Sequence, residues 1–288
     1  MFVYIKNTDI SVFFIFVVMK EKYINIEGYQ ICYAEQGVGT VAILFIHGNS
    51  MSKSNFSGQF KSSALQGYRL LAIDLPGHGN SSMVNSQSYF VQSLLNIIHG
   101  FIEQKGLKKI VLCGHSLGGH IALQLLPTLK NKIVGCCIAA TLPIKPNVLN
   151  QVIPFNTGPV ANLLFETRIS EAMAEQWLKF AFYKEVSFHS FEQDILNTDV
   201  EFRASVGKAL KTGEIKDEVE ILGHFSHPVL MAKGKHDKIL NHKYIEFVEG
   251  KSANLLQKTI FNSSGHFPHI EETELFNEVL GSYIQEVS

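Results

Sequence analysis

A serine, an aspartate and a histidine each lie just after an apolar run of the chain. Ser116 stands in "GHSLGG" after "KKIVLC", Asp237 ends "GKHD" after "PVLMAK", and His266 ends "NSSGH" after "LLQKTIF". A serine hydroxyl is a weak nucleophile at neutral pH, so it needs a base to take its proton and an acid to orient that base. These three residue types predict acyl-transfer chemistry, provided that the fold brings them together.

The elements that must position these residues are visible as apolar runs. After the first two, these runs alternate with helical stretches such as residues 89–104. Near-continuous apolar strands separated by helices favour a mostly parallel sheet with helices on both faces. The sequence therefore predicts an α/β fold, with strands at "YINIEG", "YQICYAE", "VAILFIHG", "YRLLAID", "KIVLCG", "IVGCCIAA", "PVLMAKG" and "LLQKTIF".

Polar segments follow most of these expected strands. They include "HGNS" at 47–50 and "DLPGHGNS" at 74–81, in addition to the segments that hold the serine, the aspartate and the histidine. Ligands of open α/β sheets bind outside the carboxyl ends of the strands. We therefore expect Ser116, Asp237 and His266 to converge on one edge of the sheet, in the chain order serine, acid, histidine.

The alternation of strands and helices stops between residues 142 and 225. Four prolines fall in the first part of this segment, and helical patterns follow at 169–185 and 200–213. We interpret 142–225 as a helical cap inserted into a core formed by residues 19–141 and 226–288.

The first residues form an apolar stretch, "ISVFFIFVVM", at 10–19. It is shorter than the roughly 20 residues that span a bilayer, and no small-residue cleavage site follows it. We interpret residues 1–18 as an extension of uncertain role, with Met19 as an alternative start. A membrane or export signal is the competing interpretation, although no stable membrane span is expected.

Composition restricts the partners of the chain. Of its 288 residues, 46% are hydrophobic, and 25 Lys and Arg balance 26 Asp and Glu. A large core is therefore available, and no basic surface is expected to hold nucleic acid. The four cysteines form no C-x-x-C pair, which favours reduced thiols and a cytoplasmic location. A small neutral molecule is the expected partner, and the oligomeric state is not indicated.

Taken together, these motifs resemble the α/β-hydrolase fold superfamily of serine hydrolases. The G-x-S-x-G pattern follows a strand and opens a helix, and "HGNS", "DLPGHGNS" and a late "GH" accompany it from about Lys20 onward. The resemblance implies Ser116 as nucleophile, His266 as base and Asp237 as acid. It also implies an oxyanion hole made by the backbone N–H groups of Asn49 and Leu117, with no cofactor and no metal.

Two of these assignments have rivals. Some relatives carry the acid after the strand that ends here at Thr141, where no carboxylate stands, which leaves Asp237. His269 competes with His266, but the resemblance places the base directly after a glycine, which favours His266.

Two further residues are expected near the substrate, His115 beside the nucleophile and Trp177, the sole tryptophan, in the cap. Ordinary packing explains both positions as well.

Within this superfamily, "HGNSMS", "DLPGHGNSS" and "SLGGHIAL" are similar to the metal-independent N-acyl-homoserine lactonases. The resemblance implies a small N-acylated lactone as substrate. The chain departs from that pattern at His115, where those enzymes have tryptophan, and at Asp237, where they have glutamate.

Three alternatives use the same fold. A broad-specificity carboxylesterase needs the same residues, and a ligand receptor with slow turnover also keeps them. A C–C bond hydrolase would need a cation for a substrate carboxylate, for which Arg168 and Arg203 are candidates, although both are interpreted as exposed helix charges.

Overall fold

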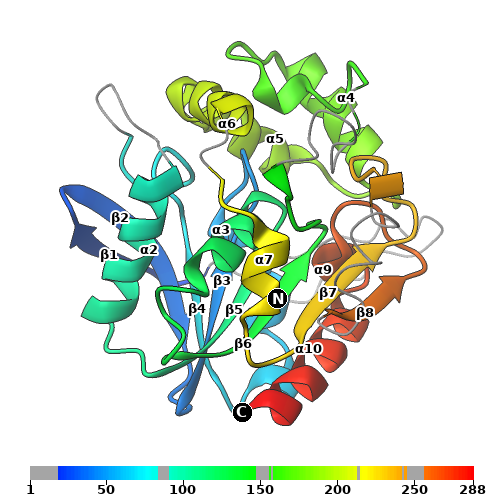
Figure 1. Cartoon of the computed structure of the whole chain (residues 1–288). Helices are drawn as coiled ribbons and strands as arrows, with labels where there is room; N and C mark the ends of the chain where they lie inside the picture. The colour runs from blue at the N-terminus through cyan, green and yellow to red at the C-terminus, as the bar shows by residue number, and fades with distance from the viewer. Residues whose placement is uncertain are drawn as a thin grey trace, which may run out of the picture.

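The structure of the chain is a computed structural model that describes residues 19–83, 91–146, 156, 158–212, 215–241, 243–244 and 256–288. The extension assigned to residues 1–18 lies outside these described residues. Figure 1 shows a twisted central sheet with helices on both faces and a group of helices above the carboxyl ends of its strands.

All eight predicted strands are present in one sheet, in the order β1-β2-β4-β3-β5-β6-β7-β8. β1 and β2 run antiparallel to their neighbours, whereas β3 to β8 are parallel. The central strand β3 is apolar and buried along its whole length, as expected where helices cover both faces of a sheet. The strands are β1 Glu21–Ile26, β2 Tyr29–Gln36, β3 Val41–Ile46, β4 Arg69–Ile73, β5 Lys109–His115, β6 Ile133–Ala139, β7 Val229–Gly234 and β8 Leu256–Phe261.

One face of the sheet is covered by α2 Val91–Gln104, α3 Leu117–Leu125 and α7 Glu218–Gly223. The helix α2 is amphipathic, and its inward side buries Leu94, Ile98 and Phe101 at intervals of three and four residues. The opposite face is covered by shorter segments and the last helix: η1 Lys53–Phe56, α1 Ser57–Phe60, η2 Ser63–Leu65, α9 Pro268–Glu271 and α10 Thr273–Val287.

Within residues 142–225, η4 Leu163–Phe165, α4 Glu171–Ala181, α5 His189–Asn197 and α6 Val200–Thr212 lie above the carboxyl ends of the strands (Figure 1). A separate apolar cluster holds α4 and α5 to Phe267 of the core. The helix α7, at the end of this range, packs instead against α3. The interpretation of residues 142–225 as an inserted domain stays a prediction, and "the cap" below means η4, α4, α5 and α6 with the described residues between them.

The expectation that Arg203 is an exposed charge is wrong. Its side chain is only 2% exposed, and its guanidinium donates hydrogen bonds to the carbonyl groups of Glu166, Thr167 and Ile195. Arg203 therefore links α5 and α6 to the segment before α4, since a buried cation needs such partners.

The cysteines are free and buried: Cys32 in β2, Cys113 in β5, and Cys136 and Cys137 in β6. Among the helices that the structure describes, none is long and apolar enough to cross a membrane.

Candidate active site

Ser116 occupies the turn between β5 and α3. Its backbone has φ 50° and ψ −115°, a conformation that costs a non-glycine residue on the order of 1–3 kcal/mol. Its N–H donates to the carbonyl of Ala139, and its carbonyl accepts the N–H of Gly119, both at 2.9 Å. These bonds hold the strained turn, so the Ser116 side chain projects beyond the end of the sheet.

The glycines around Ser116 are required by close packing. A Cβ on Gly114 would lie 2.1 Å from the carbonyl oxygen of Gly118, and a Cβ on Gly118 would lie 2.0 Å from that of Ile46. A Cβ on Gly119 would lie 2.2 Å from the Thr141 hydroxyl. The G-x-S-x-G-G pattern therefore reflects the approach of α3 to β3 and β6.

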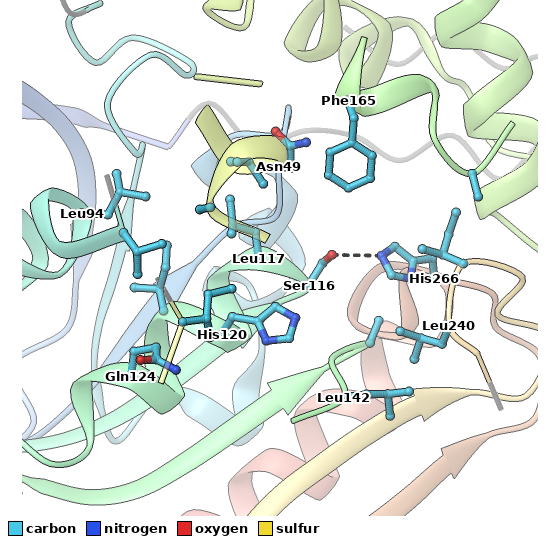
Figure 2. A pocket seen from close by; sticks show the side chains of 18 of the residues that line it. Asn49, Leu94, Ser116, Leu117, His120, Gln124, Leu142, Phe165, Leu240 and His266 are labelled. Carbon is cyan, nitrogen blue, oxygen red and sulfur yellow. Dashed lines mark hydrogen bonds between the residues drawn. The ribbon is translucent and has the colours of Figure 1, made fainter. Parts of the chain in front are cut away.

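The structure brings Ser116, His266 and Asp237 into one line of hydrogen bonds. His266 Nε2 lies 3.2 Å from Ser116 Oγ, and His266 Nδ1 lies 2.9 Å from Asp237 Oδ2 (Figure 2 shows the first contact). A carboxylate only accepts, so Nδ1 carries the proton and donates to Asp237. The lone pair of Nε2 therefore faces the Ser116 hydroxyl.

Asp237 is buried and held by the loop after β7. Its Oδ1 accepts the N–H groups of Ile239 at 2.8 Å and Leu240 at 3.1 Å, which leaves Oδ2 for His266. These bonds fix the carboxylate in the orientation that the histidine requires.

Glu271 holds the loop that carries His266, a role that the sequence reasoning did not anticipate. Its Oε1 accepts the N–H groups of Gly265 at 2.8 Å and Phe267 at 3.3 Å, on either side of the histidine. Its Oε2 accepts those of Tyr183 at 2.7 Å and Lys184 at 3.0 Å, in the cap. Burial raises the pKa of Glu271, whereas these four hydrogen bonds act in the opposite direction.

Asn49 and Leu117, the expected oxyanion-hole residues, line the same cavity as Ser116 and His266. Neither backbone N–H group donates a hydrogen bond to a residue that the structure describes. Both donors are therefore available beside Ser116. Their role in binding an oxyanion remains a prediction.

Two buried histidines fix the loop that contains Asn49. His47 Nε2 accepts the N–H of Leu75 at 2.9 Å, and His78 Nε2 accepts the N–H of Ser50 at 3.1 Å. Burial lowers the pKa of both histidines, which keeps them neutral and able to accept. The sequence alone indicates no role for His78, because its partner at Ser50 is distant along the chain.

A cavity of about 120 Å³ extends from Ser116 between the core and the cap. One side is a single face of α3, with Leu117, His120, Ile121 and Gln124 (Figure 2). The remaining described lining is mostly apolar: Val91, Leu94, Ala140, Leu142, Ala161, Phe165, Val206, Ala209, Ile215, Ile239 and Leu240, with Asn49 and Asn156 as polar members.

His115 and Trp177 do not line this cavity. His115 is buried behind His266, where its Nε2 donates to the His266 carbonyl at 2.8 Å and its ring lies 4.6 Å from that of His269. Trp177 packs edge-on against His266 at 6.4 Å, within the cap cluster. The expected contact of both residues with substrate stays a prediction.

The rival positions differ in what they contact. His269 is buried against His115 and Phe56, and His266 is the histidine that lies beside Ser116. Thr141, at the rival acid position, donates its hydroxyl hydrogen bond to the Ser116 and Ala139 carbonyls. In the described ranges, no group of three or more His, Cys, Asp or Glu side chains is arranged to hold a metal ion.

The model of the α/β hydrolase family matches residues 43–279, which is most of the chain. The chain belongs to the α/β hydrolase family. A Mycoplasma pneumoniae protein provisionally named esterase/lipase 2 is 25% identical to this α/β hydrolase over 254 residues, covering 85% of this chain and 89% of that protein. Lipase 1 of Psychrobacter immobilis is 23% identical over 258 residues, covering 85% of this chain and 77% of the lipase.

Solved structures agree on the fold of this α/β hydrolase. The N-acyl homoserine lactonase AidH, complexed with N-butanoyl homoserine, has a TM-score of 0.84 and 24% identity, covering 94% of this chain and 98% of AidH. An esterase from Exiguobacterium antarcticum has a TM-score of 0.78 and 22% identity, covering 92% of this chain and all of the esterase.

Proposed function

We propose that this α/β hydrolase is a serine hydrolase that cleaves a carboxylic ester or lactone through an acyl-enzyme intermediate. The observation that carries the proposal is the line of hydrogen bonds from Ser116 through His266 to Asp237. An oriented nucleophile, base and acid of these types are what acyl transfer requires.

In the first half of the reaction, Ser116 Oγ forms a bond to the carbonyl carbon while His266 Nε2 takes the hydroxyl proton. Asp237 stabilises the resulting imidazolium through Nδ1–H. The negative oxygen of the tetrahedral intermediate accepts hydrogen bonds from the N–H groups of Asn49 and Leu117. When the intermediate collapses, the bond to the leaving oxygen breaks and His266 returns its proton to that oxygen.

In the second half, water attacks the acyl-enzyme. His266 Nε2 takes a proton from the water as its oxygen bonds to the acyl carbon, and then gives that proton to Ser116 Oγ as the acyl bond breaks. With a lactone, the leaving alcohol stays part of the acyl group, so the product is a single hydroxy acid.

The mostly apolar cavity supports a substrate with a hydrocarbon acyl part. The likeness to AidH in complex with N-butanoyl homoserine supports an N-acylated lactone as the specific substrate. We therefore propose an N-acyl homoserine lactone as the first substrate to test. We also propose that the enzyme needs no cofactor and is cytoplasmic, a location that its free cysteines favour.

A broad-specificity carboxylesterase is the second candidate, supported by the lipase and esterase relatives.

A relative from Pseudomonas putida is named 2-hydroxy-6-oxononadienedioate/2-hydroxy-6-oxononatrienedioate hydrolase 1 and is 22% identical. Neither candidate cation favours such a dicarboxylate substrate here, because the guanidinium of Arg203 is already engaged by backbone carbonyls and Arg168 is exposed and does not line the cavity.

The test compares N-hexanoyl homoserine lactone with p-nitrophenyl hexanoate for the wild-type protein, Ser116→Ala and Ser62→Ala. Proton release in a pH-stat measures both reactions. We expect Ser116→Ala to lower kcat by about 10⁴-fold or more, and Ser62→Ala to leave it unchanged. The Ser62 side chain forms no capping hydrogen bond, so it controls for serine removal.

Hydrolysis of the ester but not of the lactone would support the carboxylesterase. Equal, slow turnover by wild type and Ser116→Ala on both compounds would contradict the enzyme and support a receptor.

A further inference from the structure

His120 stands one helical turn after Ser116 on the face of α3 that lines the cavity. Four residues of α-helix advance about 6 Å along the axis, and side chains tilt toward the N-terminus of their helix. The His120 ring therefore lies near the start of any acyl group bound to Ser116. Figure 2 shows the ring between Ser116 and Gln124.

The orientation of the His120 ring is fixed by Glu218 of α7. His120 Nδ1 lies 2.9 Å from Glu218 Oε2 and 3.2 Å from Oε1. The carboxylate is fully buried, and a carboxylate only accepts. Nδ1 therefore carries a proton, and in the neutral ring Nε2 carries the lone pair.

Glu218 is itself held firmly. It accepts the N–H of Ile144 at 2.7 Å and the side-chain amide of Gln124 at 3.1 Å. Gln124 also donates to the carbonyl of Lys216 at 3.0 Å. The buried carboxylate thus has several partners, and it positions the His120 ring rather than taking part in a reaction.

The second nitrogen of His120 has a different environment. Among the described residues, Nε2 has no hydrogen-bond partner, and the side chain is 20% exposed. Its neighbours in the cavity wall are mostly apolar, including Leu117 and Ile121 on the same helix face. A bound ligand that lacks a donor at this point would remove water from Nε2 and leave the acceptor unpaired, which costs free energy, so a ligand with a donor here is favoured.

We infer that His120 is a specificity-determining residue, whose Nε2 accepts a hydrogen bond from a hydroxyl group on the acyl chain close to the scissile carbonyl. The preferred substrates are then 3-hydroxyacyl esters or lactones. This inference rests on the proposed function, because the attachment of the acyl group to Ser116 sets the distance to His120.

The test uses p-nitrophenyl octanoate and the two enantiomers of p-nitrophenyl 3-hydroxyoctanoate. The ratio of kcat/KM between hydroxylated and plain substrate is measured for the wild type, His120→Leu and Ile121→Leu. We expect the wild type to favour one enantiomer and His120→Leu to lower that ratio about tenfold, the worth of one hydrogen bond. Ile121→Leu changes the same helix face without a polar atom and should keep the wild-type ratio.

His120→Leu leaves the Glu218 carboxylate with one donor fewer and is expected to reduce stability. The double variant His120→Leu/Glu218→Gln removes that charge and should show the same low ratio with a higher Tm. A wild-type ratio that is retained in both variants would overturn the inference. A preference for p-nitrophenyl 3-oxooctanoate, which offers only an acceptor, would overturn it as well.

A binding measurement separates this inference from the proposed function. Calorimetry measures the affinities of 3-hydroxyoctanoate and of octanoate for two variants, Ser116→Ala and Ser116→Ala/His120→Leu. The measurement requires no turnover. Tighter binding of the hydroxy acid that depends on His120 supports the donor site even if no ester is cleaved. If Ser116→Ala binds both acids equally while the wild type cleaves the ester, the role of His120 is contradicted and the proposed function is retained.

Discussion

Glu271 accepts the backbone N–H of Gly265 at 2.8 Å, directly before the histidine that faces Ser116. The same carboxylate accepts the N–H groups of Tyr183 and Lys184 in the cap. A single buried side chain therefore sets the position of the His266 loop relative to both the core and the cap.

For Glu271→Gln, we expect kcat to fall by about 10- to 100-fold, with a smaller change in KM and a loss of about 2 kcal/mol of stability. The amide replaces one acceptor oxygen with a donor that faces backbone N–H groups. Steady-state kinetics well below the Tm of the variant measure the effect, with Glu274→Gln on the exposed first turn of α10 as control. A variant that lost stability but kept full kcat would contradict this positioning role.

Asp237→Asn should lower kcat by roughly 10³- to 10⁴-fold with little change in Tm. The asparagine oxygen can still accept the N–H groups of Ile239 and Leu240. Its amide, however, would donate toward His266 Nδ1 and thereby place the ring proton on Nε2, where it blocks proton transfer from Ser116. Ester hydrolysis and thermal unfolding of the same preparation check both parts. Near-normal turnover would argue for a different acid.

Most of the fold could be predicted from the sequence, because each strand is marked by an apolar run within a few neighbouring residues. The eight apolar runs identified the strands, and the order of polar residues at their ends predicted that Ser116, Asp237 and His266 meet. Glu271, Glu218 and His78 were not predictable in this way. Each of them bonds a backbone N–H that lies far away along the chain: that of Tyr183 for Glu271, of Ile144 for Glu218 and of Ser50 for His78. The local sequence does not reveal such partners, and the prediction for Arg203 was wrong for the same reason.

Asp194 of α5 connects the cap to the core, and its protonation should affect the free energy of unfolding. It accepts a hydrogen bond from the Ser52 hydroxyl at 2.8 Å, and burial raises its pKa from 3.8 to about 7. Between these values the folded state holds a proton that the unfolded state has released. The contribution of Asp194 to the free energy of unfolding should therefore decrease as pH rises from about 4 to about 7, whereas the buried histidines, whose pKa values lie below the usual 6.5, act in the opposite direction.

Asp194→Asn should remove this contribution, so that the difference in the free energy of unfolding between variant and wild type grows with pH and reaches about 2 kcal/mol in favour of the variant at pH 8. Urea unfolding at pH 5 and pH 8 measures the difference. Glu171→Gln, which neutralises an exposed carboxylate of the cap, should leave the pH dependence intact. An identical slope in wild type and Asp194→Asn would refute the assignment.

Gly118→Ala should destabilise the protein by about 3 kcal/mol or more, or prevent its folding. The added Cβ would lie 2.0 Å from the backbone oxygen of Ile46, which cannot move without displacing β3 from α3. Gly67→Ala is the matched control, because a Cβ there has no neighbour within 4 Å. Thermal unfolding of both variants decides the matter, and equal Tm values would contradict the packing argument.

The four buried cysteines can report which part of the sheet opens first. Cys32 lies in the antiparallel part near one edge, whereas Cys113, Cys136 and Cys137 lie in the two adjoining central strands β5 and β6. None is exposed, so an alkylating reagent can reach each thiol only when the surrounding structure opens. The order in which mass spectrometry finds them labelled would therefore reveal whether the edge of the sheet separates before its centre.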